Sequence, residues 1–390
     1  MRQGFTRPVM YGLFGSLVIA TALGCAGEDP APPVTVAPAP SSTSGLYVVM
    51  TRPPNVPATF VATPNGWFDP DCVVAVAPDE HVTIEGHVAR ANGSIRREAT
   101  QCKSPRYDVE GRAIVETNVH DGEAPAVPTT NGWVEYANST ALGAMSYVHA
   151  QWTVPAAPTS NTGQVIYFFP GTENASSVTS IMQPVLGYNH AYGPAGVWSM
   201  ASWNCCVTGT TWYSTPFISA TAGTTVSGDM QGTSCNAATG VCPNWSIVSR
   251  NSAGTTTTLL TTTTQAQNWL FGHVLEVYGI DTCSELPASS PSVASGFVLR
   301  NAAGTTVSPP AWTNSLLGVS PSCSYSIAHT ATTATLAWSN AGTMVCTPGD
   351  DRSCCPFTNG CSCDGDQICN AAGTGWGACM GAGQAGHPCP

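Results

Sequence analysis

Residues 268–280, NWLFGHVLEVYGI, constrain the fold more than any other stretch, because nearly every position in them is apolar or aromatic. Apolar side chains on both faces, rich in β-branched and aromatic types, predict a strand that is covered on both sides within a sheet. Read with a period of two, one face carries Trp269, Phe271, His273, Leu275 and Val277, and the other carries Leu270, Val274, Glu276, Tyr278 and Ile280.

Glu276 is the one acidic residue in this stretch. A buried carboxylate is costly to ionise unless a cation or several donors meet it, so we expect the pKa of Glu276 to be raised. A buried carboxyl group of raised pKa suits general acid–base catalysis. The alternative is a structural glutamate that is bonded to a neighbouring strand or that faces a wet cleft.

Short β-rich segments separated by turn residues fill the rest of the main body, and no amphipathic helix of useful length interrupts them. This spacing predicts an all-β fold, an antiparallel two-sheet sandwich. Only 9% of the residues are charged, which is typical of extracellular β-proteins rich in Thr and Ser. The formal net charge of −11 argues against nucleic acid as a partner.

Residues 1–25 are typical of a bacterial lipoprotein signal peptide, with an apolar segment that ends in TALGC. Cys25 is then the lipidated residue, although ordinary cleavage nearby is an alternative. Residues 26–46, rich in Pro, Ala and Ser, are expected to be a tether. The sequence therefore predicts an extracytoplasmic protein, either secreted or anchored to a bacterial membrane through its N-terminal lipid only.

Cysteine usage also indicates an oxidising compartment, because 16 of the 17 cysteines remain after Cys25 and an even number in an exported chain implies disulfides. We expect Cys72–Cys102, Cys283–Cys323, and Cys205 or Cys206 with Cys235 or Cys242, although spacing alone does not fix the pairing. The other eight are Cys346, Cys354, Cys355, Cys361, Cys363, Cys369, Cys379 and Cys389.

The domain organisation follows from these composition changes. We expect a small β module at 47–128 (the N-terminal module), a β-sandwich at 129–342 and a disulfide-rich tail at 343–390. Because the module precedes the main body, it has the position of a pro-segment. The tail has too few large apolar residues for a core, so disulfides must hold it.

Gln183 is the second candidate, in the segment VTSIMQPVLG, where it shares a face with Ile181 and Val185. An amide among apolar neighbours needs hydrogen-bond partners. Pro184 cannot donate to a β-ladder, so we expect this strand to lie at an edge or to be bulged. If Glu276 took a proton from water, the Gln183 amide could donate to the oxyanion that forms.

The order of four motifs, WTVP (152–155), IMQPVLGY (181–188), NWLFGHVLEVYG (268–279) and SGFVL (295–299), resembles the eqolisin, or glutamic peptidase, family. The resemblance spans roughly residues 140–300. It implies a concanavalin A-like sandwich that hydrolyses peptide bonds in acid without a cofactor or metal. Gln183 and Glu276 fall at the positions of the family's catalytic dyad, and Trp203, Trp269 and Tyr278 are candidate substrate-binding walls of the cleft.

Two segments depart from the family pattern. The chain has YFFP (167–170) where the family has a Trp-rich WVG segment, and SWNCC (202–206) where the family has WYEW. Two other functions therefore stay open, a lectin-like binder of glycans and a structural envelope protein. Convergence of Gln183 and Glu276 in one cleft favours the enzyme, whereas a row of exposed Trp on a concave sheet, with Glu276 out of reach of Gln183, favours the binder.

Overall fold

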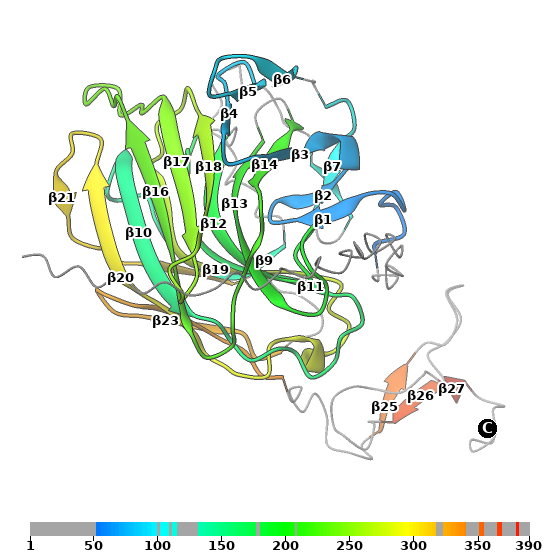
Figure 1. Cartoon of the computed structure of the whole chain (residues 1–390). Helices are drawn as coiled ribbons and strands as arrows, with labels where there is room; N and C mark the ends of the chain where they lie inside the picture. The colour runs from blue at the N-terminus through cyan, green and yellow to red at the C-terminus, as the bar shows by residue number, and fades with distance from the viewer. Residues whose placement is uncertain are drawn as a thin grey trace, which may run out of the picture. The chain divides into compact units, whose positions relative to one another are not determined.

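The computed structural model describes residues 52–99, 102–108, 111–114, 132–176, 180–206, 209–316 and 323–340, and the backbone of three short strands beyond them (Figure 1). The expected signal peptide, Cys25 and the tether lie outside the described residues, as do the side chains of the tail cysteines. Within the described part of the chain, no helix has the length and apolar character needed to cross a membrane.

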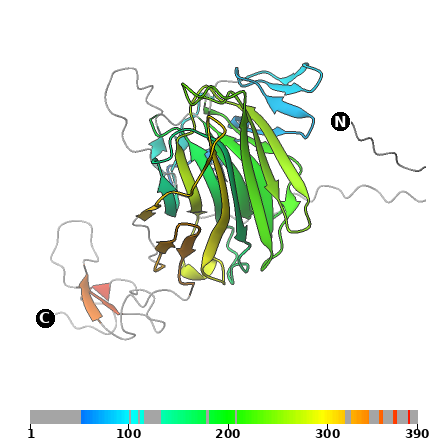
Figure 2. The ribbon, with the colours of Figure 1, turned by 90° about the vertical axis from the view of Figure 1, so that its left-hand side faces the viewer.

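The main body is an all-β sandwich of two sheets that lie face to face, as the sequence predicts (Figures 1 and 2). The first, which we call the outer sheet, is antiparallel throughout. Its strands, in order across the sheet, are β18 (Thr256–Thr262), β17 (Asn244–Arg250), β16 (Thr225–Thr233), β10 (Met145–Thr153), β20 (Ser292–Asn301), β24 (Ala334–Ala337) and β23 (Ser326–His329), with β21 (Thr306–Val307) beside β20.

The second, the central sheet, carries both candidate residues. Its strands, in order, are β22 (Thr313–Leu316), β9 (Trp133–Ser139), β19 (Trp269–Tyr278), β11 (Val165–Glu173), β12 (Ile181–Tyr188), β13 (Trp198–Cys205), β14 (Thr211–Ser214) and β3 (Val73–Val76), with β15 (Ile218–Ser219) beside β13. All its pairs are antiparallel except β14 with β3. Because β3 belongs to the N-terminal module, the module contributes an edge strand to the sandwich.

The rest of the module consists of small hairpins. One sheet contains β1 (Val61–Thr63), β2 (Gly66–Phe68), β7 (Arg106–Tyr107) and β8 (Ala113–Ile114), and another contains β4 (Glu80–Val82), β5 (Val88–Arg90) and β6 (Ile95–Arg97). Two short 3-10 helices are also described, Pro70–Cys72 in the N-terminal module and Cys283–Glu285 in the main body between β19 and β20. In the tail, β25 (Asp351–Cys354), β26 (Gly365–Ile368) and β27 (Met380–Gly381) form an antiparallel sheet.

The central sheet is the middle of three layers. On one face, Phe168 and Leu275 pack with Trp152 of the outer sheet. On the other face, Tyr167 and Tyr278 pack with Trp67 of the N-terminal module. Every residue of β19 is therefore buried, and the prediction of a strand covered on both sides is confirmed.

The predicted faces of this strand are wrong at its N-terminal half. A β-bulge shifts the pairing of β19 with β9 between Phe271 and His273. Phe271 consequently packs on the module side against Trp133, whereas His273 points to the outer sheet, where its Nε2 lies 2.8 Å from the Ser292 hydroxyl. The strand needs glycine between them, because a Cβ at Gly272 would lie 2.7 Å from the Trp312 ring.

The expectation for Pro184 is also wrong, since β12 is a central strand and its pairing with β13 runs without a shift. The irregularity lies on its neighbour β11, where the pairing with β19 shifts between Phe169 and Gly171. The paired residues of β11 and β12 also skip from Phe168↔Leu186 to Thr172↔Met182. The missing N–H groups of Pro170 and Pro184 thus fall in one gap of the ladder.

Four disulfides lie in the described region. Cys72 is bonded to Cys102 and Cys283 to Cys323, as expected. The third expectation is wrong, because Cys205 is bonded to Cys206 and Cys235 to Cys242. The last strand residue of β13 thus pairs with its own neighbour, and Cys235–Cys242 closes a loop between β16 and β17.

Candidate active site

Glu276 lies near the end of β19, between Tyr167 of β11 and Trp133 of β9. It is fully buried, and both carboxyl oxygens accept hydrogen bonds: Oε1 from the Tyr278 hydroxyl and Oε2 from Trp133 Nε1 at 3.1 Å. Burial raises the pKa of Glu276 well above its usual range, against the two hydrogen bonds and the positive charge of Arg106, which lower it. The structure therefore holds an oriented carboxyl group whose burial favours the protonated form.

Gln183 lies on β12 opposite Trp203 of β13 and is fully buried. Both of its amide atoms contact the tip of the β1–β2 hairpin. Nε2 donates to the carbonyl oxygen of Pro64 at 3.3 Å, and Oε1 accepts from the Asn65 side chain at 3.3 Å. The partners that the sequence required for this amide are therefore supplied by the N-terminal module.

The two candidates share one face of the central sheet, with β11 between their strands. Glu276 pairs with Tyr167 of β11, whereas Gln183 lies beside Gly171, whose Cβ position would be 3.5 Å from Gln183 Cγ. This offset of four residues corresponds to about 13 Å along the strand. No direct hydrogen bond between Gln183 and Glu276 occurs among the described contacts, so the carboxyl and the amide share one face but do not meet in one cleft in this closed arrangement.

The β1–β2 hairpin bridges this offset. Its tip, residues 64–67, contacts Gln183 at one end, and at the other end the Trp67 ring packs edge-on against Tyr278 with centroids 5.5 Å apart. Tyr167, which lies beside Glu276, donates from its hydroxyl to the Ala62 carbonyl at 3.0 Å. The hairpin therefore fills the face between the amide and the carboxyl.

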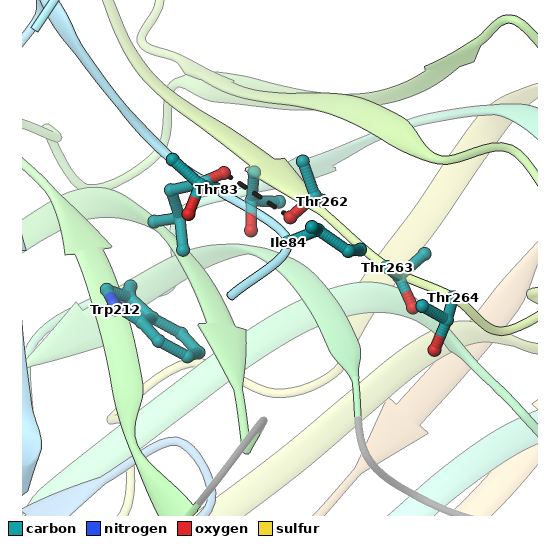
Figure 3. A pocket seen from close by; sticks show the side chains of 8 residues that line it. Thr83, Ile84, Trp212, Thr262, Thr263 and Thr264 are labelled. Atoms are coloured by element: carbon teal, nitrogen blue, oxygen red, sulfur yellow. Dashed lines mark hydrogen bonds between the residues drawn. The ribbon is translucent and has the colours of Figure 1, made fainter. Parts of the chain in front are cut away.

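The open hollow that Figure 3 shows lies elsewhere, where the chain after β4 meets the end of β18. Thr83 and Ile84 line it from the module, and Trp212 and Thr262–Thr264 line it from the sandwich. It includes neither Gln183 nor Glu276, and its few threonine hydroxyls offer no acid–base group. We therefore place the candidate site beneath the hairpin and not in this hollow.

The three predicted wall residues lie on the hairpin-covered face. Trp203 stacks on His190 and Tyr213 and donates from Nε1 to His190 Nε2 at 2.8 Å. Trp269 donates from Nε1 to Asn138 at 3.0 Å. Each is buried, and every tryptophan in the described region is at most 5% exposed. The described surface thus lacks the exposed Trp row that would favour a glycan binder.

Sequence reasoning missed several contributors to this face. Trp133 was not assigned a role, nor were Asn65 and Arg106 of the module. Glu173 was also missed, although it follows the apolar run 165–169, a pattern that could have marked a carboxyl group at the end of a buried strand. It is 3% exposed, and burial raises its pKa to about 8, while the charge of Arg106 lowers it.

Within the described part of the chain, no three His, Cys, Asp or Glu residues gather as metal ligands would. Glu135 is a further buried carboxyl group, on β9, and burial raises its pKa to about 9. It contributes to neither the Gln183 nor the Glu276 contacts.

No protein-family model and no curated protein matches the chain. Among solved structures, the chain is similar to scytalidoglutamic peptidase with a peptide-based transition-state analogue, at 13% identity and a TM-score of 0.39. It is also similar to SCP-B, a member of the eqolisin family, in complex with the tripeptide Ala-Ile-His, at 13% identity and a TM-score of 0.38. Each match covers 55% of this chain and all of the other chain. The resemblance indicated by the sequence motifs is confirmed as a loose one.

Proposed function

We propose that this chain is a glutamic-type endopeptidase that hydrolyses peptide bonds at acid pH, with Glu276 as general base and then acid and with Gln183 as oxyanion donor. One observation carries the proposal. Gln183 Nε2 donates to the peptide carbonyl of Pro64, which is the contact that an oxyanion donor makes with a scissile carbonyl. On the same face, Glu276 supplies a buried carboxyl group held by two donors.

The chemistry follows from these two groups. The ionised Glu276 takes a proton from water as the water oxygen attacks the carbonyl carbon. The negative charge that develops on the carbonyl oxygen is stabilised by the Gln183 amide N–H. Glu276 then gives its proton to the amide nitrogen as the C–N bond breaks. Tyr278 and Trp133 orient the carboxyl group throughout, and no cofactor enters the reaction.

The closed arrangement cannot perform this reaction, because residues 64–67 occupy the space where a substrate strand would lie. We therefore propose that the N-terminal module serves as a pro-segment. Withdrawal of the hairpin would admit water and a peptide, and water would return the pKa of Glu276 toward its usual range. β3 is paired within the central sheet, so the hairpin can withdraw while this strand stays.

The cellular setting of the proposal rests on the leader. A lipid on Cys25 and the tether at 26–46 would hold the enzyme outside the cytoplasm, on a bacterial membrane. An exported location agrees with the four disulfides of the described region. Its substrates would then be peptides or unfolded proteins in that compartment.

The test is digestion of a denatured protein substrate by the purified chain from residue 26 onward, from acid to neutral pH, with and without proteolytic nicking of the module. Glu276→Gln and Gln183→Ala are compared with Glu135→Gln, a buried carboxyl group on β9 that lies apart from the site. We expect acid-dependent cleavage that both site variants lose and the control keeps. Cleavage that survives Glu276→Gln would overturn the proposal.

A further inference from the structure

The hairpin presents main-chain carbonyl groups of one strand to side chains of the central sheet. β1 is the edge strand of its four-stranded sheet, so one row of its main-chain groups faces away from β2. The Ala62 carbonyl oxygen of β1 accepts a hydrogen bond from the Tyr167 hydroxyl at 3.0 Å. Pro64 directly follows β1, and its carbonyl oxygen accepts from Gln183 Nε2 at 3.3 Å. Two donors of the central sheet therefore bind carbonyls that are two residues apart in the chain.

This spacing is the one that an extended peptide offers. Residues of a strand rise by about 3.3 Å each and alternate in orientation, so the carbonyls of residues i and i+2 point to the same side. Main-chain hydrogen bonds of this kind give affinity for an extended chain whatever its side chains are. A substrate strand in the place of β1 would therefore meet both donors at once, with one carbonyl at Tyr167 and the other at Gln183.

The Tyr167 hydroxyl is oriented by groups that do not belong to the hairpin. Its oxygen accepts from the Ala191 backbone N–H at 3.2 Å, which directs its own hydrogen toward another acceptor. The Tyr167 ring packs edge-on against His190, with centroids 5.1 Å apart. Gly187 of β12 makes room for both rings, since a Cβ there would lie 2.9 Å from the tyrosine ring and 2.6 Å from the imidazole. The donor is therefore held in place independently of the segment that must withdraw.

The Tyr167 hydroxyl also suits a site that works in acid. A tyrosine hydroxyl titrates at about pH 10 and a glutamine amide does not titrate, so both donors are intact across the acid range. Tyr167 is the cross-strand partner of Glu276 of β19. A chain held by this hydroxyl would therefore lie beside the carboxyl group that the proposed reaction uses.

We propose that Tyr167 is a substrate-binding residue, whose hydroxyl binds the main-chain carbonyl two residues before the cleaved bond, and that the substrate lies extended along the path of β1 and in its direction. The inference rests on the proposed function, in which Gln183 holds the reacting carbonyl. In the closed protein the hairpin fills both positions with the carbonyls of Ala62 and Pro64. The site then requires chains that continue beyond the two residues directly before the cleaved bond, as an endopeptidase does.

The first test measures binding and does not depend on enzymatic activity. The protein is opened with Asn65→Ala/Trp67→Ala and carries Glu276→Gln to prevent cleavage. It is titrated in acid with acetyl-Val-Ala-Thr-Pro-Asn-amide, the sequence of residues 61–65, and with the same peptide carrying sulfur in place of oxygen at the alanine carbonyl. Sulfur is the weaker acceptor, so the oxygen peptide should bind about fivefold more tightly.

Tyr167→Phe in this background should remove the preference for the oxygen peptide. Tyr188→Phe, on the opposite face of the central sheet, is the matched control and should keep it. A preference that survives Tyr167→Phe would overturn the proposal, as would the absence of binding by a protein whose β1 amides exchange with solvent. The nicked protein replaces the opened one if β1 stays protected from exchange.

The second test measures cleavage by the active, nicked protein of two peptides that differ only in oxygen or sulfur at the carbonyl two residues before the cleaved bond. Tyr167→Phe should lower kcat/KM about fivefold for the oxygen peptide and leave that for the sulfur peptide unchanged. An equal loss for both peptides would mean that Tyr167 acts only through the fold and would overturn the proposal. Failure of the unmodified protein to cleave any peptide contradicts the proposed function instead, and the binding preference then decides the carbonyl contact separately.

Discussion

Gln183 donates a hydrogen bond from Nε2 to the carbonyl oxygen of Pro64, and its Oε1 accepts one from Asn65, so a single hairpin tip satisfies the whole amide. The contact joins residues that are 119 positions apart in the chain. It means that the amide proposed to stabilise an oxyanion is oriented by a peptide of the protein itself. The closed and open proteins should therefore differ most at residues 64–67.

Asn65→Ala should loosen the hairpin. Loss of the hydrogen bond to Gln183 Oε1 costs about 1 kcal/mol and leaves a buried acceptor without this donor. We expect faster hydrogen exchange in β1 and β2, with the outer sheet unaffected. Asn92→Ala, at an exposed turn between β5 and β6, is the matched control. Equal exchange in the two variants would show that Asn65 does not hold the hairpin.

Tyr278→Phe should change the pH dependence of catalysis. The Tyr278 hydroxyl donates to Glu276 and lowers the pKa of that carboxyl group. Without this donor the pKa of Glu276 rises, so the limb of the kcat profile that requires ionised Glu276 should move to higher pH. Tyr188→Phe, on the opposite face of the central sheet, should leave the limb in place. An unmoved limb in Tyr278→Phe would remove Tyr278 as an orienting residue.

Glu173 should make the closed protein less stable as pH rises. Its pKa is raised from 4.5 to about 8, so its contribution to stability is complete below pH 4.5 and is lost as pH rises toward 8. The loss amounts to at most about 5 kcal/mol. Glu173→Gln cannot ionise, and the difference in unfolding free energy between the two proteins should grow in its favour across that window.

The difference in unfolding free energy between the unmodified protein and Glu173→Gln reports on the ionisation of Glu173 alone. His190 and His273, whose pKa values burial lowers to about 3, act in the opposite sense but are common to both proteins and cancel. Chemical denaturation at closely spaced pH values supplies the measurement. A difference that is independent of pH would mean that Glu173 keeps its usual pKa in the folded protein.

Removal of the Cys72–Cys102 disulfide should destabilise the module selectively. The bond closes a loop across a sequence separation of 30, for which the expected contribution is about 2–4 kcal/mol. Cys72→Ser/Cys102→Ser should therefore expose β1, β2 and β7 to hydrogen exchange before the sandwich opens. Cys235→Ser/Cys242→Ser, which opens a loop across a separation of 7, should have the smaller effect. The reverse order would contradict a separately opening module.

The sequence predicts the sandwich and the burial of Glu276 because a strand that is apolar on both faces must be covered on both sides of its sheet. It does not predict the bulge beside Gly272, since a strict period of two contains no extra residue. It also cannot show that Pro170 and Pro184 fall in one gap of the ladder, because that depends on which strands become neighbours. The contacts of Arg106 and Asn65 were missed for the same reason, as they join segments about a hundred residues apart.

The most direct test of the account is acid proteolysis by a protein whose hairpin is opened through substitution. Asn65→Ala/Trp67→Ala removes the Asn65 hydrogen bond to Gln183 and the packing of Trp67 on Tyr278, which leaves the Pro64 carbonyl as the remaining described contact of the tip with Gln183. We predict that this folded variant cleaves a denatured substrate in acid faster than the unmodified protein, and that adding Glu276→Gln abolishes the cleavage. A folded, opened variant that cleaves nothing at any pH, or that cleaves equally well with Glu276→Gln, would contradict the account.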